Sequence, residues 1–309
     1  MKTLKFIISL IFVGLSLSLS AQDAAFFKKY ADKGDKEAMY NLADCYFNGK
    51  GGVAQDINTG IMWLSKSAKK NYAPAQRDLA ICYLYGLGVL IDYKMAWELL
   101  NKAQKKGDAD ATYYIAQMYK NGQHVPKSAT LYISNLKTAA QAGSNNALAE
   151  LGHMYLLGDK DLNIYQDKYT AVQYLQKAAE QNNSDALLDL GFCYRDGVGG
   201  LKSNLEKSFE YIYKAAEAGN TKAYCEVGMC YLQGYGTEQN YDQAFKCLSY
   251  AAQQGIPNAY KKYSEICIIT AMAFRKIMQK QPNGIKKLLM KVMVMHIQVW
   301  QICTVWAWV

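Results

Sequence analysis

Histidine is scarce in this chain of 309 residues, and the three histidines (His124, His153 and His296) are far apart in the sequence. The chain also lacks Cys-x-x-Cys, paired histidines and any acidic cluster with the spacing of metal ligands. It has no phosphate-binding glycine loop, because its glycines follow the regular period described below. We therefore expect no metal site and no cofactor.

Acidic residues are missing from both ends of the chain, and this accounts for most of its net charge of +9. Residues 1–21 carry two lysines and residues 270–309 carry six basic residues, with no Asp or Glu in either segment. Without these two and six charges, about +1 is left for the body of the protein. A nearly neutral body lacks the electrostatic footprint of a nucleic-acid-binding protein.

Residues 1–21 have the pattern of a cleavable export signal. Lys2 and Lys5 precede an apolar run from Phe6 to Leu19, which is too short for a comfortable transmembrane span, and Ser20-Ala21 supply small residues for cleavage. Since no cysteine directly follows the run, we expect neither a lipoprotein anchor nor a stable membrane span after cleavage. The sequence thus predicts a periplasmic or extracellular protein, and a buried N-terminal helix is the alternative.

One motif recurs six times with a period of roughly 37 residues. Counted from a leading alanine at position 0, it has Leu, Ile or Val at position 4, Ala or Gly at 5, Tyr at 8 and Gly at 11. Positions 0, 4 and 8 share one helical face, the glycine ends the helix, and the small residue lets a second helix cross closely. The leading alanines are Ala38, Ala75, Ala111, Ala147, Ala186 and Ala223, and a seventh copy begins at Ala259.

This pattern resembles the Sel-one-like repeat family, a branch of the tetratricopeptide-like helical repeats, from about Ala38 to Cys267. The resemblance implies an all-α fold, a right-handed α-solenoid of about seven helix-turn-helix repeats, which we place at residues 22–269. Neighbouring repeats must stack, because one helix pair cannot bury both of its faces. The family resemblance also implies an adaptor in protein–protein complexes, without naming a partner. The linkers at residues 124–128 and 159–167 lack the usual Gly-x-Gly.

Eight cysteines are an even number, which in an exported protein can indicate disulfides. Equivalent positions of stacked repeats lie on the order of 10 Å apart, whereas a disulfide needs Cα atoms within about 7 Å. The repeated cysteines are therefore predicted to be small buried hydrophobic residues. Cys45, Cys82, Cys193 and Cys230 each precede the repeat tyrosine, and Cys267 lies near the same point of the seventh copy. Cys230–Cys247 remains the one pairing that we keep open.

Ser-x-x-Lys occurs at Ser67–Lys70 and at Ser134–Lys137, and this spacing is the nucleophile motif of penicillin-recognising enzymes. Both copies fall at the end of a second helix, where lysine recurs anyway, and neither Lys-Thr-Gly nor Ser-Asp-Asn accompanies them. We predict no catalytic residue. A cell-wall- or β-lactam-acting hydrolase is the enzyme alternative, and a base within hydrogen-bond reach of either serine would favour it.

The predicted binding surface is the concave groove of the solenoid, lined by first-helix residues that face away from the second helix. Tyrosine, arginine and amide side chains are common at binding surfaces, although an ordinary solvated helix face is the alternative. We expect an exported, non-catalytic scaffold that binds an unidentified protein or peptide there. A peptidoglycan- or polysaccharide-binding module is a further alternative. The predicted groove residues are Tyr40, Asp44, Arg77, Tyr113, Gln117, Lys120, His153, Phe192 and Arg195.

Residues 270–309 lack the motif, and we predict that they are out of frame and without a defined fold. If the gene is retranslated with each codon starting at the third base of the present one, the identity of several residues is fixed, because the single codons for Met and Trp end in G. Met295 and Trp300 then give Ala, and Trp306 and Trp308 give Gly. The result fits Ala-x-x-x-Leu-Ala-Asn-Leu-Tyr-x-x-Gly-x-Gly, with its first Ala about 36 residues after Ala259.

We therefore expect a one-base frame disruption between roughly Cys267 and Met272. An apolar anchoring tail over Val292 to Val309 is the alternative, although polar residues interrupt it. Resequencing the locus, or the intact mass of the native protein, decides between them. Confirmation of the present frame, together with a tail docked as an ordered anchor, would contradict the prediction.

Overall fold

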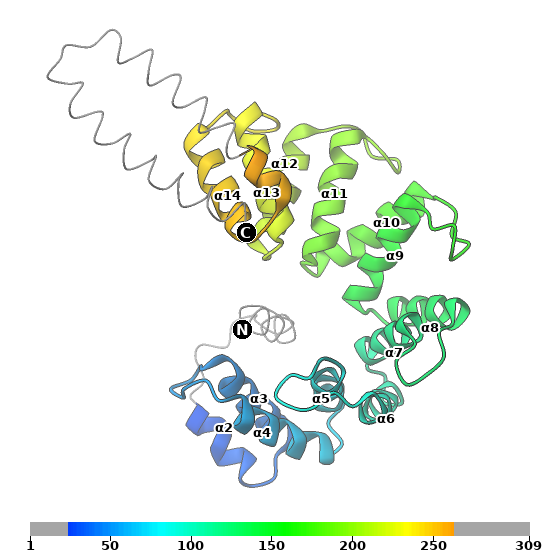
Figure 1. Ribbon diagram of the computed structural model, residues 1–309, viewed down its shortest axis with the longest axis vertical. Helices are drawn as coiled ribbons and strands as arrows, with labels where there is room; N and C mark the ends of the chain where they lie inside the picture. The colour runs from blue at the N-terminus through cyan, green and yellow to red at the C-terminus, as the bar shows by residue number, and fades with distance from the viewer. Residues whose placement is uncertain (1–23, 263–309) are drawn as a thin grey trace, which may run out of the picture. The chain divides into compact units, whose positions relative to one another are not determined.

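The structure is a computed structural model that describes residues 24–262, and these residues form paired helices (Figure 1). The predicted signal of residues 1–21 and the predicted out-of-frame tail lie outside the described residues. Within the described range the β structure is a single isolated bridge between Asp159 and Ile164, which confirms the all-α prediction. The chain divides into two compact units, residues 1–186 and 187–309, and each is described by itself.

The first unit contains four helix pairs, which follow one additional helix, α2 (Ala24–Ala31). Within each pair the two helices pack on each other, and the second helix also packs on the first helix of the next pair. This is the arrangement that the repeat period predicts. The pairs are α3 (Lys36–Asn48) with α4 (Ile57–Lys69), α5 (Ala73–Tyr85) with α6 (Tyr93–Gln104), α7 (Ala109–Asn121) with α8 (Ala129–Gln141), and α9 (Asn145–Leu157) with α10 (Lys168–Glu180).

The second unit holds the fifth and sixth repeats and the start of the seventh. Its helices are α11 (Ser184–Asp196), which begins just before the unit boundary, α12 (Leu205–Glu217), α13 (Thr221–Gln233) and α14 (Tyr241–Gln253). In this unit α13 packs against both α12 and α14. Residues 257–262 are helical and lie at the start of the seventh repeat.

Local sequence signals begin and end these helices as expected. Most N-cap residues are Asp, Asn or Ser with a side-chain oxygen that accepts a backbone N–H, as Asp35 does from Ala38 at 2.8 Å. The repeat glycine ends the first helix in the left-handed conformation, with φ of 61° at Gly49. His124 adopts the same conformation (φ 64°), in the linker that lacks Gly-x-Gly. The chain thus makes the same turn there with a side chain that tolerates it less readily.

The small residue at position 5 has the predicted cause, because the second helix crosses directly over it. Leu42 and Ala43 are fully buried in the first repeat. In the later repeats a Cβ atom on the glycine would lie 2.5 Å from Ile212 at Gly191 and 2.6 Å from Leu248 at Gly228. Larger side chains would push the paired helices apart, so the motif alternates only between Ala and Gly at this position.

The six described cysteines are thiols rather than halves of disulfides. Cys45, Cys82 and Cys193 are buried as predicted, whereas Cys230 and Cys247 are partly exposed and remain unbridged. Burial raises the pKa of Cys82 to about 12, so this thiol is protonated and unreactive at neutral pH.

Reductant should therefore change the melting temperature of the folded protein by no more than about 2 °C, because the six described cysteines form no crosslink that reduction could break. Thermal unfolding followed by circular dichroism, with and without reductant, measures this. Alkylation of the denatured, unreduced chain is the control and should modify at least the six described thiols. A drop above about 10 °C, equivalent to several kcal/mol for a body of this size, would reveal disulfides.

None of the described helices has the length and apolar character that a membrane span requires.

Candidate functional site

The nine predicted groove residues occupy positions 2, 6 and 9 of their repeats, and we call these the groove positions. Seven of them lie in the first unit and two, Phe192 and Arg195, in the second. In the first unit most of them hydrogen-bond to other side chains of the protein. In the second unit one of them, Arg195, lines a cavity.

The first network, the Arg77 network, joins three repeats of the first unit. The Tyr40 hydroxyl donates to Asp78 Oδ2 at 2.7 Å, and Arg77 Nε donates to Asp78 Oδ1 at 2.8 Å. Arg77 Nη1 also donates to Asp108 Oδ2 at 3.0 Å, and Asp108 caps α7. The side chain of Asp78 is 1% exposed and that of Arg77 is 18% exposed. These side chains therefore join neighbouring repeats, and little of their surface is exposed to a binding partner.

Burial and charge act in opposite directions in this network. Burial raises the pKa of Asp78, while the Arg77 guanidinium lowers it, and the net effect is a raised pKa. Burial alone would lower the pKa of Arg77, but the carboxylates of Asp78 and Asp108 reverse this and raise it. Each charge is therefore tolerated in the interior because the other is present.

The second network, the Glu150 network, links the third and fourth repeats. Glu150 accepts hydrogen bonds from Gln117 Nε2 at 2.6 Å, Lys120 Nζ at 2.7 Å and the Tyr132 hydroxyl at 2.5 Å. Tyr132 is only 1% exposed. Burial and the carboxylate of Glu150 raise the pKa of Tyr113, which lies beside it. Three predicted groove residues thus meet around one carboxylate.

The other two predicted residues of the first unit differ from these. Asp44 accepts from Asn48 Nδ2 at 2.6 Å on its own helix, and burial raises its pKa. His153 is exposed. Asp78 and Glu150, the acceptors of the two networks, were missed by the sequence analysis. Their signal is an acidic residue at position 3, which recurs in the fifth repeat as Asp189 and in the sixth as Glu226.

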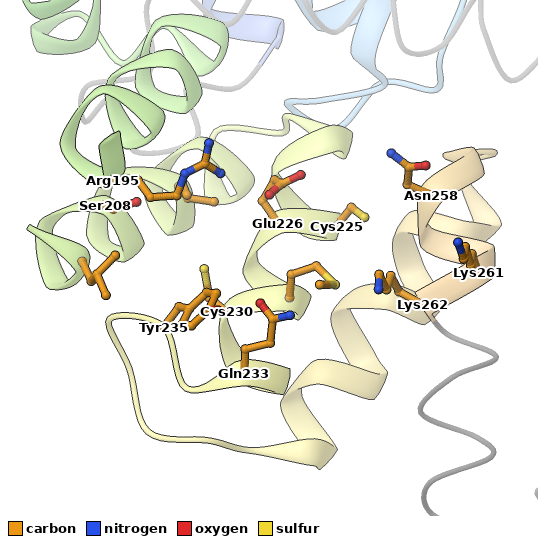
Figure 2. A pocket seen from close by; sticks show the side chains of 13 residues that line it. Arg195, Ser208, Cys225, Glu226, Cys230, Gln233, Tyr235, Asn258, Lys261 and Lys262 are labelled. Carbon is orange, nitrogen blue, oxygen red and sulfur yellow. The ribbon is translucent and has the colours of Figure 1, made fainter. Parts of the chain in front are cut away.

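A cavity of about 410 Å³ lies in the second unit, between α12, α13 and the start of the seventh repeat (Figure 2). Groove positions contribute Arg195 from the fifth repeat, Cys225 and Met229 from the sixth and Lys261 from the seventh. Leu205, Ile212 and Met229 supply apolar lining. Of the predicted groove residues only Arg195 belongs to this cavity, which we call the Glu226 pocket.

The Glu226 pocket is mixed in charge. Figure 2 shows Glu226 on α13 with Arg195 on one side and Asn258 and Lys261 on the other. Burial raises the pKa of Glu226, and Arg195 lowers it. Arg195 Nε pairs with Asp196 Oδ1 at 2.8 Å, and its guanidinium lies 4.8 Å from the Phe192 ring centroid.

The two thiols of the Glu226 pocket are not nucleophiles. Burial is the main cause that raises the pKa of both Cys225 and Cys230 to about 11, and the carboxylate of Glu226 adds to it. In the described part of the chain no group of three or more His, Cys, Asp or Glu side chains could hold a metal ion. The lining of the pocket offers hydrogen bonding, charge pairing and apolar contact.

The two Ser-x-x-Lys serines have different surroundings. Ser67 is fully buried and donates to the backbone oxygen of Lys36 at 2.6 Å. Ser134 is exposed and lines a shallow hollow of about 440 Å³ together with Lys137 and Asp161. Within residues 24–262, no side chain accepts a hydrogen bond from Ser134 Oγ. The arrangement that would indicate an activated serine is not formed at either position.

Comparison with known proteins matches the Sel1 repeat to six consecutive segments: residues 36–72, 73–108, 109–144, 145–183, 184–220 and 221–256. The chitin synthase regulator SKT5 of Saccharomyces cerevisiae is 32% identical over 189 residues, which are 58% of this chain and 27% of that protein. This chain therefore spans about a quarter of that relative's length.

Two solved structures share the fold. A Sel1 repeat protein from Oxalobacter formigenes superposes with a TM-score of 0.62 at 28% identity, over 74% of this chain and 92% of its own. A protective antigen of uropathogenic Escherichia coli with the Sel1-like repeat fold gives a TM-score of 0.55 at 25% identity, over 85% of this chain and 60% of its own. Together with the six matched repeats, these likenesses show that the chain belongs to the Sel1 repeat family.

Proposed function

We propose that this protein is an exported, non-catalytic scaffold that binds a protein or peptide partner through the groove positions of its second unit. The observation that supports the proposal is the Glu226 pocket of about 410 Å³, because groove positions of three repeats line it. The corresponding side chains of the first unit already satisfy one another in the Arg77 and Glu150 networks. Side chains that open onto a cavity are better placed to contact a partner.

The family supports a role in protein–protein contact, since Sel1 repeats build scaffolds. One relative is named as a regulator of chitin synthase, which is consistent with action through another protein. Export rests on the basic and apolar pattern of residues 1–21.

A hydrolase would need an activated serine. Ser67 cannot serve because it is buried and bonded to the backbone, and Ser134 lies in a shallow hollow without an engaged base. Covalent labelling of Ser134 by a β-lactam or a fluorophosphonate, lost in Ser134→Ala, would restore the enzyme hypothesis. The proposed scaffold should give no such labelling.

Site-specific photocrosslinking tests the binding site. A photoreactive amino acid at Gln233, which lines the Glu226 pocket, should crosslink a discrete protein in a cell-envelope extract. The same group at Tyr165, which is 86% exposed on a linker of the first unit, is the matched control and should not give that adduct. Equal adducts from both positions, or adducts with glycan fragments alone, would contradict the proposal.

A further inference from the structure

We propose that the Glu226 pocket receives a tyrosine side chain of the partner, whose hydroxyl donates to the Glu226 carboxylate. This inference rests on the proposed function and names what the pocket recognises. The two networks of the first unit support it, because in both of them a carboxylate at the same repeat position accepts a hydrogen bond from a tyrosine hydroxyl.

Asp78, Glu150, Asp189 and Glu226 all stand at position 3 of their repeats. Asp78 accepts from the hydroxyl of Tyr40, and Glu150 accepts from the hydroxyl of Tyr132. A cation completes each set, Arg77 in the first and Lys120 in the second. In the second and fourth repeats, then, the chain supplies its own tyrosine to the carboxylate at position 3.

The fifth repeat lacks the residues that would donate a hydrogen bond to Glu226 in the same way. Leu188 stands at the position of Tyr113, and Phe192 at that of Gln117. Ser208 is the fourth residue after the N-cap Asn204, just as Tyr132 is the fourth after Ser128. Only the cation is kept, since Arg195 shares position 9 with Lys120.

These replacements explain why Glu226 lacks a tyrosine donor from the fifth repeat and why a cavity lies beside it. Ser208 is 3% exposed and lines the Glu226 pocket, so the cavity opens where Tyr132 fills the equivalent place in the third repeat. Among the described residues, no side chain donates a hydrogen bond to Glu226. A half-buried carboxylate without hydrogen-bond donors raises the free energy of the folded protein. A ligand that donates a hydrogen bond to this carboxylate therefore gains binding free energy.

The rest of the lining favours tyrosine over a basic side chain. Arg195, Lys261 and Lys262 line the pocket together with Glu226, so a lysine or arginine of the partner would enter beside cations. A phenol is neutral, and its ring matches the apolar lining of Leu205, Ile212 and Met229.

Short peptides and the full chain test this inference. Acetyl-Gly-Tyr-Gly-amide should bind about ten-fold more tightly than its phenylalanine analogue, the effect of one hydrogen bond to a charged acceptor. The phosphotyrosine analogue should bind more weakly than both, because its phosphate would face Glu226. Isothermal titration calorimetry measures all three. Equal affinity of the tyrosine and phenylalanine peptides, or tighter binding of the phosphopeptide, would overturn the inference.

Two variants locate the site. Ser208→Tyr should refill the pocket and abolish peptide binding, whereas Ser134→Tyr, an exposed second-helix control, should leave binding unchanged. Glu226→Gln keeps the shape of the pocket and should weaken the tyrosine peptide about ten-fold but not the phenylalanine analogue. If Glu226→Gln affects neither peptide, the inference fails even where Ser208→Tyr does not fold.

The same variants separate this inference from the proposed function. If the Gln233 crosslink to a protein disappears in Ser208→Tyr but the pocket shows no preference for tyrosine, only the present inference is wrong. If the crosslink persists in a folded Ser208→Tyr variant, the pocket is not the binding site and both proposals fail.

Discussion

Replacing Arg77 with methionine should lower the free energy of unfolding by about 3–5 kcal/mol, the usual cost of removing one partner from a buried ion pair. The variant removes the guanidinium from the carboxylate of Asp78, which is 1% exposed and still accepts a hydrogen bond from the hydroxyl of Tyr40. Asp108 loses the same guanidinium. Urea unfolding followed by circular dichroism at neutral pH measures the change.

Arg195→Met is the matched control, because Arg195 also pairs with the aspartate that follows it in the chain. That pair is exposed, at 45% and 52% of the side-chain surfaces, so its loss should cost within about 1 kcal/mol. In addition, the triple variant Tyr40→Phe/Arg77→Met/Asp78→Leu should be more stable than Arg77→Met alone, because it removes the stranded polar groups together. Equal stability of the two single variants would show that the Arg77 network does not hold the first unit together.

The helix pairs could be predicted because every repeat contains the local sequence signals that end its first helix and pack the two helices together. An alanine, a leucine and a tyrosine on one face, a small residue at the helix crossing and a glycine at the end recur with one period. The burial of Leu42 and the close approach of Ile212 to Gly191 follow from these local signals. No long-range pairing had to be guessed, because each repeat contacts its neighbours.

The partners of the groove residues could not be predicted in the same way. Tyr40 and Arg77 have the composition of a binding surface, and the sequence does not say that Asp78 lies between them. From the sequence alone, an acidic residue at position 3 of the repeat motif would ordinarily be read as a solvent-exposed charge. Its burial depends on the side chains that the preceding repeat places over it, and these differ from repeat to repeat.

The Glu226 pocket was harder still, because it arises from a side chain that is small. Nothing in the sequence alone singles out Ser208. Its role becomes clear when it is compared with Tyr132, which occupies the equivalent position of the third repeat. Comparison of the repeats position by position would have shown this exchange. The comparison would also have needed to establish that both residues face a carboxylate.

The reciprocal exchange, Tyr132→Ser, should therefore create in the first unit the cavity that the second unit already has. Loss of a large aromatic side chain that is 1% exposed should destabilise the protein by about 3–5 kcal/mol. Tyr132→Phe removes only the hydroxyl that donates to Glu150 at 2.5 Å and should cost about 1–3 kcal/mol. The difference between the two variants measures the ring, and thermal and urea unfolding measure both.

A small phenol should restore part of what Tyr132→Ser loses. In that variant p-cresol can enter the space of the missing ring and donate to Glu150, so it should raise the melting temperature in a concentration-dependent way. Tyr132→Phe is the control, because its ring still fills the space, and p-cresol should leave its melting temperature unchanged. If p-cresol affects the two variants alike, the carboxylate at position 3 does not select a phenol, and the equivalence between the Glu150 network and the Glu226 pocket is wrong.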